Sequence, residues 1–264
     1  MNARLEVARD VGRSVVVSAE ASSPLKLLTP RNHGHAAWVY QSSQGGGFVG
    51  ADDVRLAVEV AAGASLFLSS QASSKVYRAS AAQYALTAAV ADGATLVSWP
   101  DPVVCFAGAS LAQTQTFSLR GDARLVCVDA WTSGRLAHGE RWAFERLLSR
   151  IRVEVDGVRV FQDGVLLSAQ HGALDVRMGP INAFATVVVA GALAALSSEL
   201  VARVRAQPLG DPATTALCTA SVWPWGVVLR LGAPTAEALV VVLGELLGAP
   251  VAALLGDDPW ARKW

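Results

Sequence analysis

Two histidines close together in the sequence are the first residues that could bind a metal ion. His33 and His35 are separated by one glycine, and imidazole nitrogens bind soft or borderline divalent ions. A structural or catalytic metal site usually needs at least three protein ligands, and no third candidate lies beside this pair. His138 and His171 lie far away in the sequence, so only folding could bring them near. His33 and His35 are therefore secondary metal candidates, and a solvated loop is the simpler interpretation.

Acidic side chains are the second group that could do chemistry, either as oxygen ligands or as acid–base groups. A carboxylate that faces the inside of a stacked sheet is costly unless it is paired or hydrated. Several inward-facing carboxylates would therefore line a water-filled cavity, whereas any single one more simply points to solvent. The candidates are Asp52, Asp53, Glu59, Asp129 and Glu140.

The sequence lacks the motifs of the common nucleotide-binding and hydrolytic enzymes. Gly45, Gly47 and Gly50 match GxGxxG, but a strand pattern follows them where a dinucleotide site needs a helix. No Walker A, GxSxG or HExxH motif occurs. A carboxylate enzyme would need two acids held ~5–10 Å apart in a cleft, and the sequence shows no such pair.

A threefold internal repeat must position these residues. LAVEVAAGASLFLSSQ, LTAAVADGATLVSWPD and TFSLRGDARLVCVDA each contain an alternating apolar run, a glycine turn and a second alternating run. Leu66, Leu96 and Leu125 are equivalent positions at a spacing of about 30 residues, which is typical of stacked units. We interpret each copy as a β-hairpin and predict a mainly β fold of stacked, β-helix-like sheets. An antiparallel meander is the alternative.

Strand patterns flank the repeat on both sides. Residues 5–20 and 151–162 each indicate strand, turn and strand, the second around Asp156-Gly157. A short strand is predicted at residues 38–40. Residues 217–231 also indicate a strand, interrupted at residues 223–225.

Helical periodicity appears only toward the C-terminus. Helices are predicted at residues 187–207 and 235–247, the second capped by Thr235 and ended by Gly248. The predicted plan is a β-helical body over residues 1–182, with a helix and strand segment over residues 183–264 packed on it as one domain.

The composition limits the classes of partner. The chain has 264 residues, of which 52% are hydrophobic and 17% charged, and its formal net charge is +0. A neutral chain has no general electrostatic attraction to nucleic acid or to anionic lipid. Such an apolar composition indicates a large core, or a surface that a partner covers.

Cysteine content and hydropathy favour the cytoplasm. Cys105, Cys127 and Cys218 are too few and too scattered for a disulfide framework. The first 17 residues carry charges throughout and lack the apolar core of a signal peptide. The apolar runs at residues 183–196 and 238–255 are short or interrupted, so no membrane span is predicted.

Five ordered segments resemble the urease accessory protein UreD family, called UreH in some systems. The segment GGFVGADD is similar to the family's glycine-rich turn, with Ala51 where a glycine is usual. TSGRLAHGERWAF closely matches the family's GRxAxGE motif, apart from His138. The other three segments are PLKLLTP, SSQASSKVYRA and WPDPVVCFAGASL. Together the motifs cover about residues 23–167, and the remainder of the chain is less diagnostic.

The resemblance implies a specific role. Members of the family are nonenzymatic, have a β-helical fold with added helices, and join UreF and the GTPase UreG on the urease structural subunits. The implied cargo is Ni²⁺, which passes through transiently, with no tightly bound cofactor. Oxygen ligands bind such an ion more weakly than cysteine or clustered histidine, as a passage requires.

The predicted nickel path or partner contacts combine motif positions with one further acid. Asp129 ends the third repeat beside Trp131, and the others occupy positions that match the family motifs. The full set is Asp52, Gln71, Lys75, Tyr77, Arg78, Asp129, Arg135 and Glu140. The alternative functions are a passive β-solenoid binding module without a metal role, and a small β enzyme.

Overall fold

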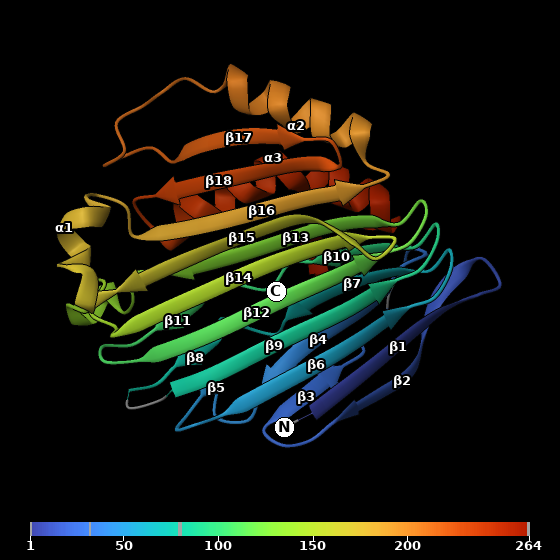
Figure 1. Cartoon of the computed structure of the whole chain (residues 1–264), viewed down its shortest axis with the longest axis horizontal. Helices are drawn as coiled ribbons and strands as arrows, with labels where there is room; N and C mark the ends of the chain where they lie inside the picture. The colour runs from blue at the N-terminus through green and yellow to red at the C-terminus, as the bar shows by residue number, and fades with distance from the viewer. Residues whose placement is uncertain (1, 32, 79–80, 263–264) are drawn as a thin grey trace.

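The computed structural model describes residues 2–31, 33–78 and 81–262, which form two β-sheets and a layer of helices (Figure 1). The first sheet, here sheet A, contains in spatial order β15 (Val158–Ser168), β14 (Arg146–Val155), β12 (Ser110–Leu119), β9 (Ala81–Val90), β6 (Asp53–Val60), β1 (Asn2–Asp10) and β2 (Arg13–Ala21). The second, sheet B, contains β17 (Leu217–Trp223), β18 (Gly226–Ala233), β16 (Ala183–Gly191), β13 (Arg124–Thr132), β10 (Thr95–Ser98), β7 (Ser65–Ser70), β4 (Ala37–Ser43) and β3 (Leu25–Leu28). Three short strands extend sheet B beside β13, namely β11 (Val103–Cys105), β8 (Lys75–Val76) and β5 (Gly47–Phe48). The prediction of a mainly β protein is confirmed.

The three repeat copies stack in register. Leu66 is the parallel partner of Leu96, which is in turn the partner of Leu125, along β7, β10 and β13 of sheet B. The first strands of the copies, β6, β9 and β12, pair in the same parallel manner in sheet A. The predicted equivalence of the three leucines is therefore confirmed.

The two strands of each copy do not form a hairpin, so that part of the prediction is wrong. Each copy places its first strand in sheet A and its second in sheet B, and hydrogen bonds run from copy to copy. Gly63 and Gly93 turn the chain from one sheet to the other with φ near +65°. Alternation of apolar residues requires only that one face of each strand is buried, and facing sheets satisfy it as well as a hairpin does.

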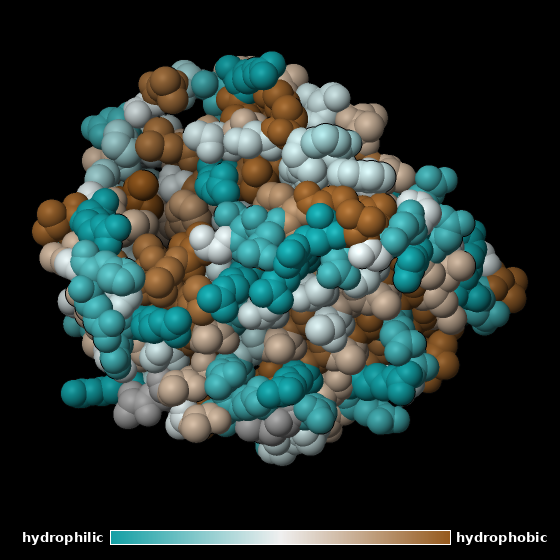
Figure 2. Space-filling model, in the orientation of Figure 1, coloured by the Kyte–Doolittle hydropathy of each residue, from teal (hydrophilic) through white to brown (hydrophobic). Residues whose placement is uncertain are grey.

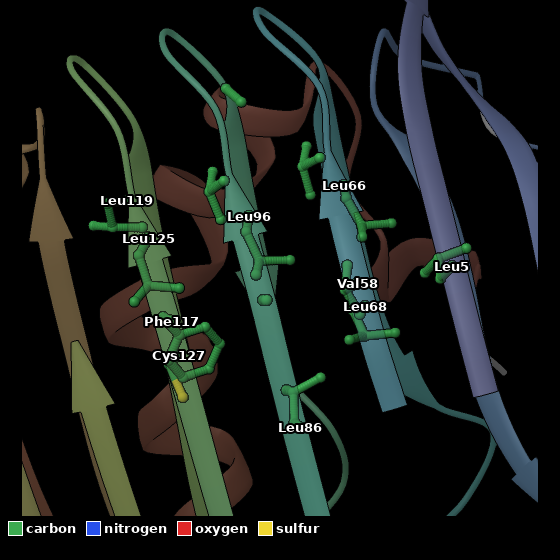
Figure 3. Close-up of a cluster of buried hydrophobic side chains, with 14 of the residues drawn as sticks. Leu5, Val58, Leu66, Leu68, Leu86, Leu96, Phe117, Leu119, Leu125 and Cys127 are labelled. Carbon is green, nitrogen blue, oxygen red and sulfur yellow. The ribbon is translucent and has the colours of Figure 1, made fainter. Parts of the chain in front are cut away.

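Leucines and other apolar side chains fill the space between the sheets on the side of the glycine turns. Figure 3 shows Leu66, Leu96 and Leu125 beside Val58 and Leu86, each at most 1% exposed. Burying a side chain of this size contributes roughly 1.5–3 kcal/mol relative to leaving it exposed. Side chains from two sheets thus interdigitate in one core.

The sheets remain open along their edges. Phe161 of β15 stacks on Trp223 of β17, with the ring centres 4.8 Å apart. Arg230 of β18 forms an ion pair with Asp163 of β15, with 2.8 Å between Nη2 and Oδ2. These contacts join the two sheets by side chains, whereas a closed fold would join them by backbone hydrogen bonds. The β-helical description of the body therefore stays a prediction.

The C-terminal part extends sheet B and covers its outer face. The chain forms the antiparallel strand β16 beside β13 before it turns into α2 (Ala194–Ala206), so the predicted helix at residues 187–207 begins too early. Burial on both faces of β16 explains the error, because a central strand and a buried helix are both uniformly apolar. The hairpin of β17 and β18 turns at Pro224 and Trp225, as the predicted interruption indicated. A short helix, α1 (Leu174–Met178), precedes β16.

The last long helix, α3, runs over Ala236–Leu255 and is longer than predicted. The Thr235 side chain accepts a hydrogen bond from the backbone of Ala238, which confirms the predicted cap, but neither Gly248 nor Pro250 ends the helix. Pro250 removes the donor for the carbonyl of Leu246. Arg203 of α2 donates to the carbonyls of Glu245 at 3.1 Å and Leu246 at 3.5 Å, so the freed carbonyl gains a new partner.

α3 is the one helix of the described residues whose length and composition would suffice to cross a membrane. In this structure it packs on sheet B with α2, and one side of it lies in the core. The buried residues of α3 are Leu239, Leu243, Leu246, Leu247, Val251 and Leu255. The opposite face of the molecule, formed by sheet A, carries many hydrophilic side chains (Figure 2).

Candidate functional site

A polar cavity of about 170 Å³ lies between the sheets, on the side away from the glycine turns. The inward positions that hold leucine or valine near the turns hold serine, glutamine, tyrosine or aspartate here. Its polar lining includes Gln41, Ser42, Ser43, Asp52, Ser70, Gln71, Ser73, Ser74, Tyr84, Ser98, Asp101, Gln113, Gln115 and Asp129. The space between the sheets is therefore apolar in one half and oxygen-rich in the other.

Asp129 is the most deeply buried acid of this cavity. It lies on β13 with 3% of its surface exposed, and both carboxylate oxygens accept hydrogen bonds. Gln113 donates from Nε2 to Oδ1 at 2.5 Å, and the Ser149 hydroxyl donates to Oδ2 at 2.5 Å. Burial raises the pKa of Asp129 to about 7, although these two hydrogen bonds act in the opposite direction. The group is therefore poised between its acid and its carboxylate near neutral pH.

Other polar groups of the cavity are also held by neighbours. The Tyr84 hydroxyl donates to Gln41 Oε1 at 2.8 Å, and burial raises the pKa of Tyr84. The Ser70 hydroxyl donates to Asp101 Oδ2 at 3.0 Å and accepts from the Asp101 backbone at 2.8 Å. The lining is thus pre-organised.

Two more predicted residues, Asp52 and Gln71, line the same cavity as Asp129. Asp52 accepts a hydrogen bond from the Val49 backbone at 2.9 Å, and Gln71 accepts one from the Ser42 hydroxyl at 2.6 Å. Folding therefore gathers three predicted residues, from distant positions in the sequence, around one space.

Lys75 and Tyr77 lie at the rim, next to the glycine-rich turn that borders the cavity. The Tyr77 hydroxyl donates to the carbonyl of Gly45 at 3.0 Å. β5 pairs with β8 so closely that a Cβ on Gly47 would lie 1.9 Å from the carbonyl oxygen of Lys75. Close backbone approach therefore requires glycine at position 47.

Arg135 and Glu140 form a separate cluster and are not part of the cavity lining. Arg135 donates through Nε to Glu140 at 2.9 Å and also through Nη2, and this ion pair lowers the pKa of Glu140. The guanidinium lies 4.1 Å from the ring centre of Phe106, and the ring centres of Phe106 and Tyr77 are 5.1 Å apart. Arg78 is exposed beside Gly108. The GRLAHGE motif thus builds a rim beside the Tyr77 segment.

The two histidines do not come together with further ligands. His33 is exposed, and the His35 ring nitrogen Nε2 lies 3.0 Å from the carbonyl of Leu254. Across residues 2–31, 33–78 and 81–262, no group of three or more His, Cys, Asp or Glu side chains is placed to hold a metal ion. The same holds for the acids of the cavity, so the cavity is a candidate site as a space lined by polar oxygens and not as a preformed metal centre.

Sequence reasoning missed several residues of this site, among them Gln113, Ser149 and Tyr84. A signal was present, because β12 alternates Leu111, Gln113, Gln115, Phe117 and Leu119 on its inward face. Polar residues at positions that the pattern assigns to the core indicate a polar interior.

Comparison with known proteins shows the family of this chain. The sequence model of the UreD urease accessory protein matches residues 1–264. A urease accessory protein UreD of Sorangium cellulosum is 47% identical over 97% of this chain and 82% of its own length. One from Anaeromyxobacter sp. is 42% identical over 98% of this chain and 88% of its own. Urease accessory protein D of Arabidopsis thaliana is 36% identical over 69% of this chain and 65% of its own. The chain therefore belongs to the UreD urease accessory protein family.

Proposed function

We propose that this chain is a nonenzymatic cytoplasmic scaffold that passes Ni²⁺ through the cavity between its sheets to apo-urease. The observation that carries the proposal is the oxygen-lined cavity, with Asp52 at one part of its wall and Asp129 deep inside. Family membership supports the link to urease. We infer that the stacked sheets form the β-helical body implied by the family resemblance.

The chemistry of the lining favours passage over storage. Hydroxyl, amide and carboxylate oxygens exchange a borderline divalent ion more readily than thiolate or clustered imidazole. Both oxygens of Asp129 already accept hydrogen bonds, so an ion would have to compete with Gln113 and Ser149. Such competition keeps the residence of the ion short.

Substitution of the cavity acids tests the passage. Asp129→Ala and Asp52→Ala should each lower the nickel content and activity of urease matured with UreF and UreG. Binding of the variants to these partners should be unchanged, because the cavity lies between the sheets. Asp10→Ala is the matched control, since Asp10 is exposed on the β1–β2 turn. Full nickel loading by both cavity variants would exclude an inner path.

We infer further that the exposed face of α3 contacts UreF. Val240 and Val241 are 48% and 58% exposed, and Cβ atoms on Gly244 and Gly248 would meet no described atom within 4 Å apart from chain neighbours and the backbone of their own helix. Val241→Arg should therefore weaken binding to UreF while leaving the fold intact. Val176→Arg on α1 is the control, because Val176 is 76% exposed on another surface.

The two alternative functions predict different outcomes. A passive binding module would bind the same partners, yet the cavity substitutions would leave nickel delivery unchanged. A carboxylate enzyme would have to free Asp129 from Gln113 and Ser149 before it could act as an acid or a base. In cells that lack their own UreD, restoration of urease activity by the parent chain but not by Asp129→Ala or Asp52→Ala distinguishes the proposed function from both.

A further inference from the structure

A second groove lies between α2 and the turn that joins β17 to β18. The residues that line it are distant in the sequence from those that line the polar cavity. The volume of the groove is about 500 Å³, and its wall includes Val201, Arg205, Val222, Trp223 and Trp225. The backbone of Gly191 donates to the carbonyl of Trp225 at 3.0 Å, which fixes the turn against β16. The groove is therefore formed before any partner binds.

The groove combines exposed apolar surface with one unpaired cation. Val222 is 65% exposed and Trp225 is 46% exposed, although both are large hydrophobic residues. Arg203 of α2 forms an ion pair with Glu199, whereas Arg205 has no acidic partner among the residues that the structure describes. Tryptophan and arginine are the residues most enriched among those that dominate binding energy at protein interfaces.

The strand beside the groove has a free edge. Within the described residues β17 pairs only with β18, so it ends sheet B. Of the other edge strands among the described residues, β5 has only two residues, and the three longer ones carry charges that oppose pairing with another chain, namely Lys26 in β3, Arg13 and Glu20 in β2, and Arg159 and Asp163 in β15. The sequence of β17, LCTASVW, contains neither a charged residue nor a proline. An edge without such protection is a template for an added strand.

We propose that the edge of β17 and this groove bind an extended, acidic segment of a partner protein. The segment adds a strand to sheet B, places an apolar side chain against Trp225 and Val222, and places a carboxylate at Arg205. Charge complementarity to Arg205 selects an acidic segment, and the strand edge selects an extended one over a helix. The proposal takes its candidate partners from the proposed function in urease maturation.

The test measures binding of the full chain to purified UreF, UreG and urease apoprotein, each titrated separately. Trp225→Ala and Arg205→Glu should each weaken binding to one of the three at least about tenfold, as expected for central interface residues. Arg120→Glu, at an exposed turn of the third repeat, is the charge control and should bind as the parent chain does. Hydrogen exchange should slow at the β17 amides in that complex and stay unchanged in β3.

Each outcome decides the proposal. Unchanged affinity of both groove variants for every partner would overturn the groove and leave the proposed function standing. Loss of affinity without slower hydrogen exchange at the β17 amides would show that the partner does not add a strand to sheet B. If the chain alone dimerises and hydrogen exchange slows at the β17 amides, a second copy of the chain occupies the groove. That result would overturn the proposal of a segment from another protein. If the parent chain binds none of the three proteins, both the proposed function and this proposal fail.

Discussion

Gln113 and Ser149 are direct neighbours on β12 and β14, and together they hold a single acid on the opposite sheet. Gln113 Nε2 donates to Ser149 Oγ at 2.9 Å, and both side chains donate to Asp129 of β13. The network crosses the space between the sheets at the wall of the cavity. Because Ser149 can either donate to Asp129 or accept from it, the network tolerates both protonation states of the acid.

The first prediction concerns pH and stability. An unfolded aspartic acid loses its proton near pH 4, whereas folded Asp129 keeps its proton up to about pH 7. The folded state therefore binds more protons between these values, and its free energy of unfolding should fall as pH rises through that window. The loss should be about 4 kcal/mol at most by linkage. Urea unfolding at several pH values between 4 and 8 measures it.

Asp129→Asn should remove this pH dependence, because an amide does not titrate. The variant should therefore gain stability relative to the parent chain as pH rises toward 8. Asp10→Asn should leave the parent slope unchanged, since Asp10 is exposed. An identical slope in the parent and Asp129→Asn would show that Asp129 ionises normally.

The second prediction concerns the other side of the network. Gln113→Leu should lower the free energy of unfolding at pH 8 by about 1–3 kcal/mol, because Asp129 loses a buried donor. The loss should be smaller at pH 5, where Asp129 is neutral. Denaturation of the parent chain, Asp129→Asn, Gln113→Leu and the double variant gives the free energy of unfolding of each. Additive losses would contradict an energetic coupling between Gln113 and Asp129.

The third prediction concerns Pro250 in α3. Arg203→Ala removes the donor to the carbonyls of Glu245 and Leu246 and also the ion pair with Glu199. Its cost should be about 1–3 kcal/mol, as for a charged hydrogen bond. Glu199→Ala removes only the exposed pair and should cost under about 1 kcal/mol. Thermal unfolding of both variants separates the two contributions, and equal losses would refute the role of Arg203 at the proline.

The fourth prediction contrasts two glycines. Gly47→Ala places a Cβ 1.9 Å from the Lys75 carbonyl oxygen, so β5 should separate from β8. Gly244→Ala, in the interior of α3 with open space around it, should stabilise the chain by about 0.5–1 kcal/mol. Hydrogen exchange at the amides of Lys75 and Tyr77, which donate to the carbonyls of Gly46 and Phe48, reports on the first change, and thermal unfolding reports on the second. Slow exchange at both residues in Gly47→Ala would contradict the close approach.

The sequence alone determined the β character of the chain, the equivalence of Leu66, Leu96 and Leu125, and the cap at Thr235. These features depend on local periods and on local hydrogen bonds, which can be read without knowing what lies opposite. The family motifs likewise identified Asp52 and Gln71 before their place in a cavity was known.

Only the tertiary structure decided which strands pair, that β16 is a strand and that α3 continues through Pro250. Alternating residues show that a face is buried but not by what, and the freed carbonyl of Leu246 finds its donor on α2. The site required folding for the same reason. Asp129, Gln113 and Ser149 lie on three strands of two sheets, and no spacing along the chain encodes a contact across the space between them.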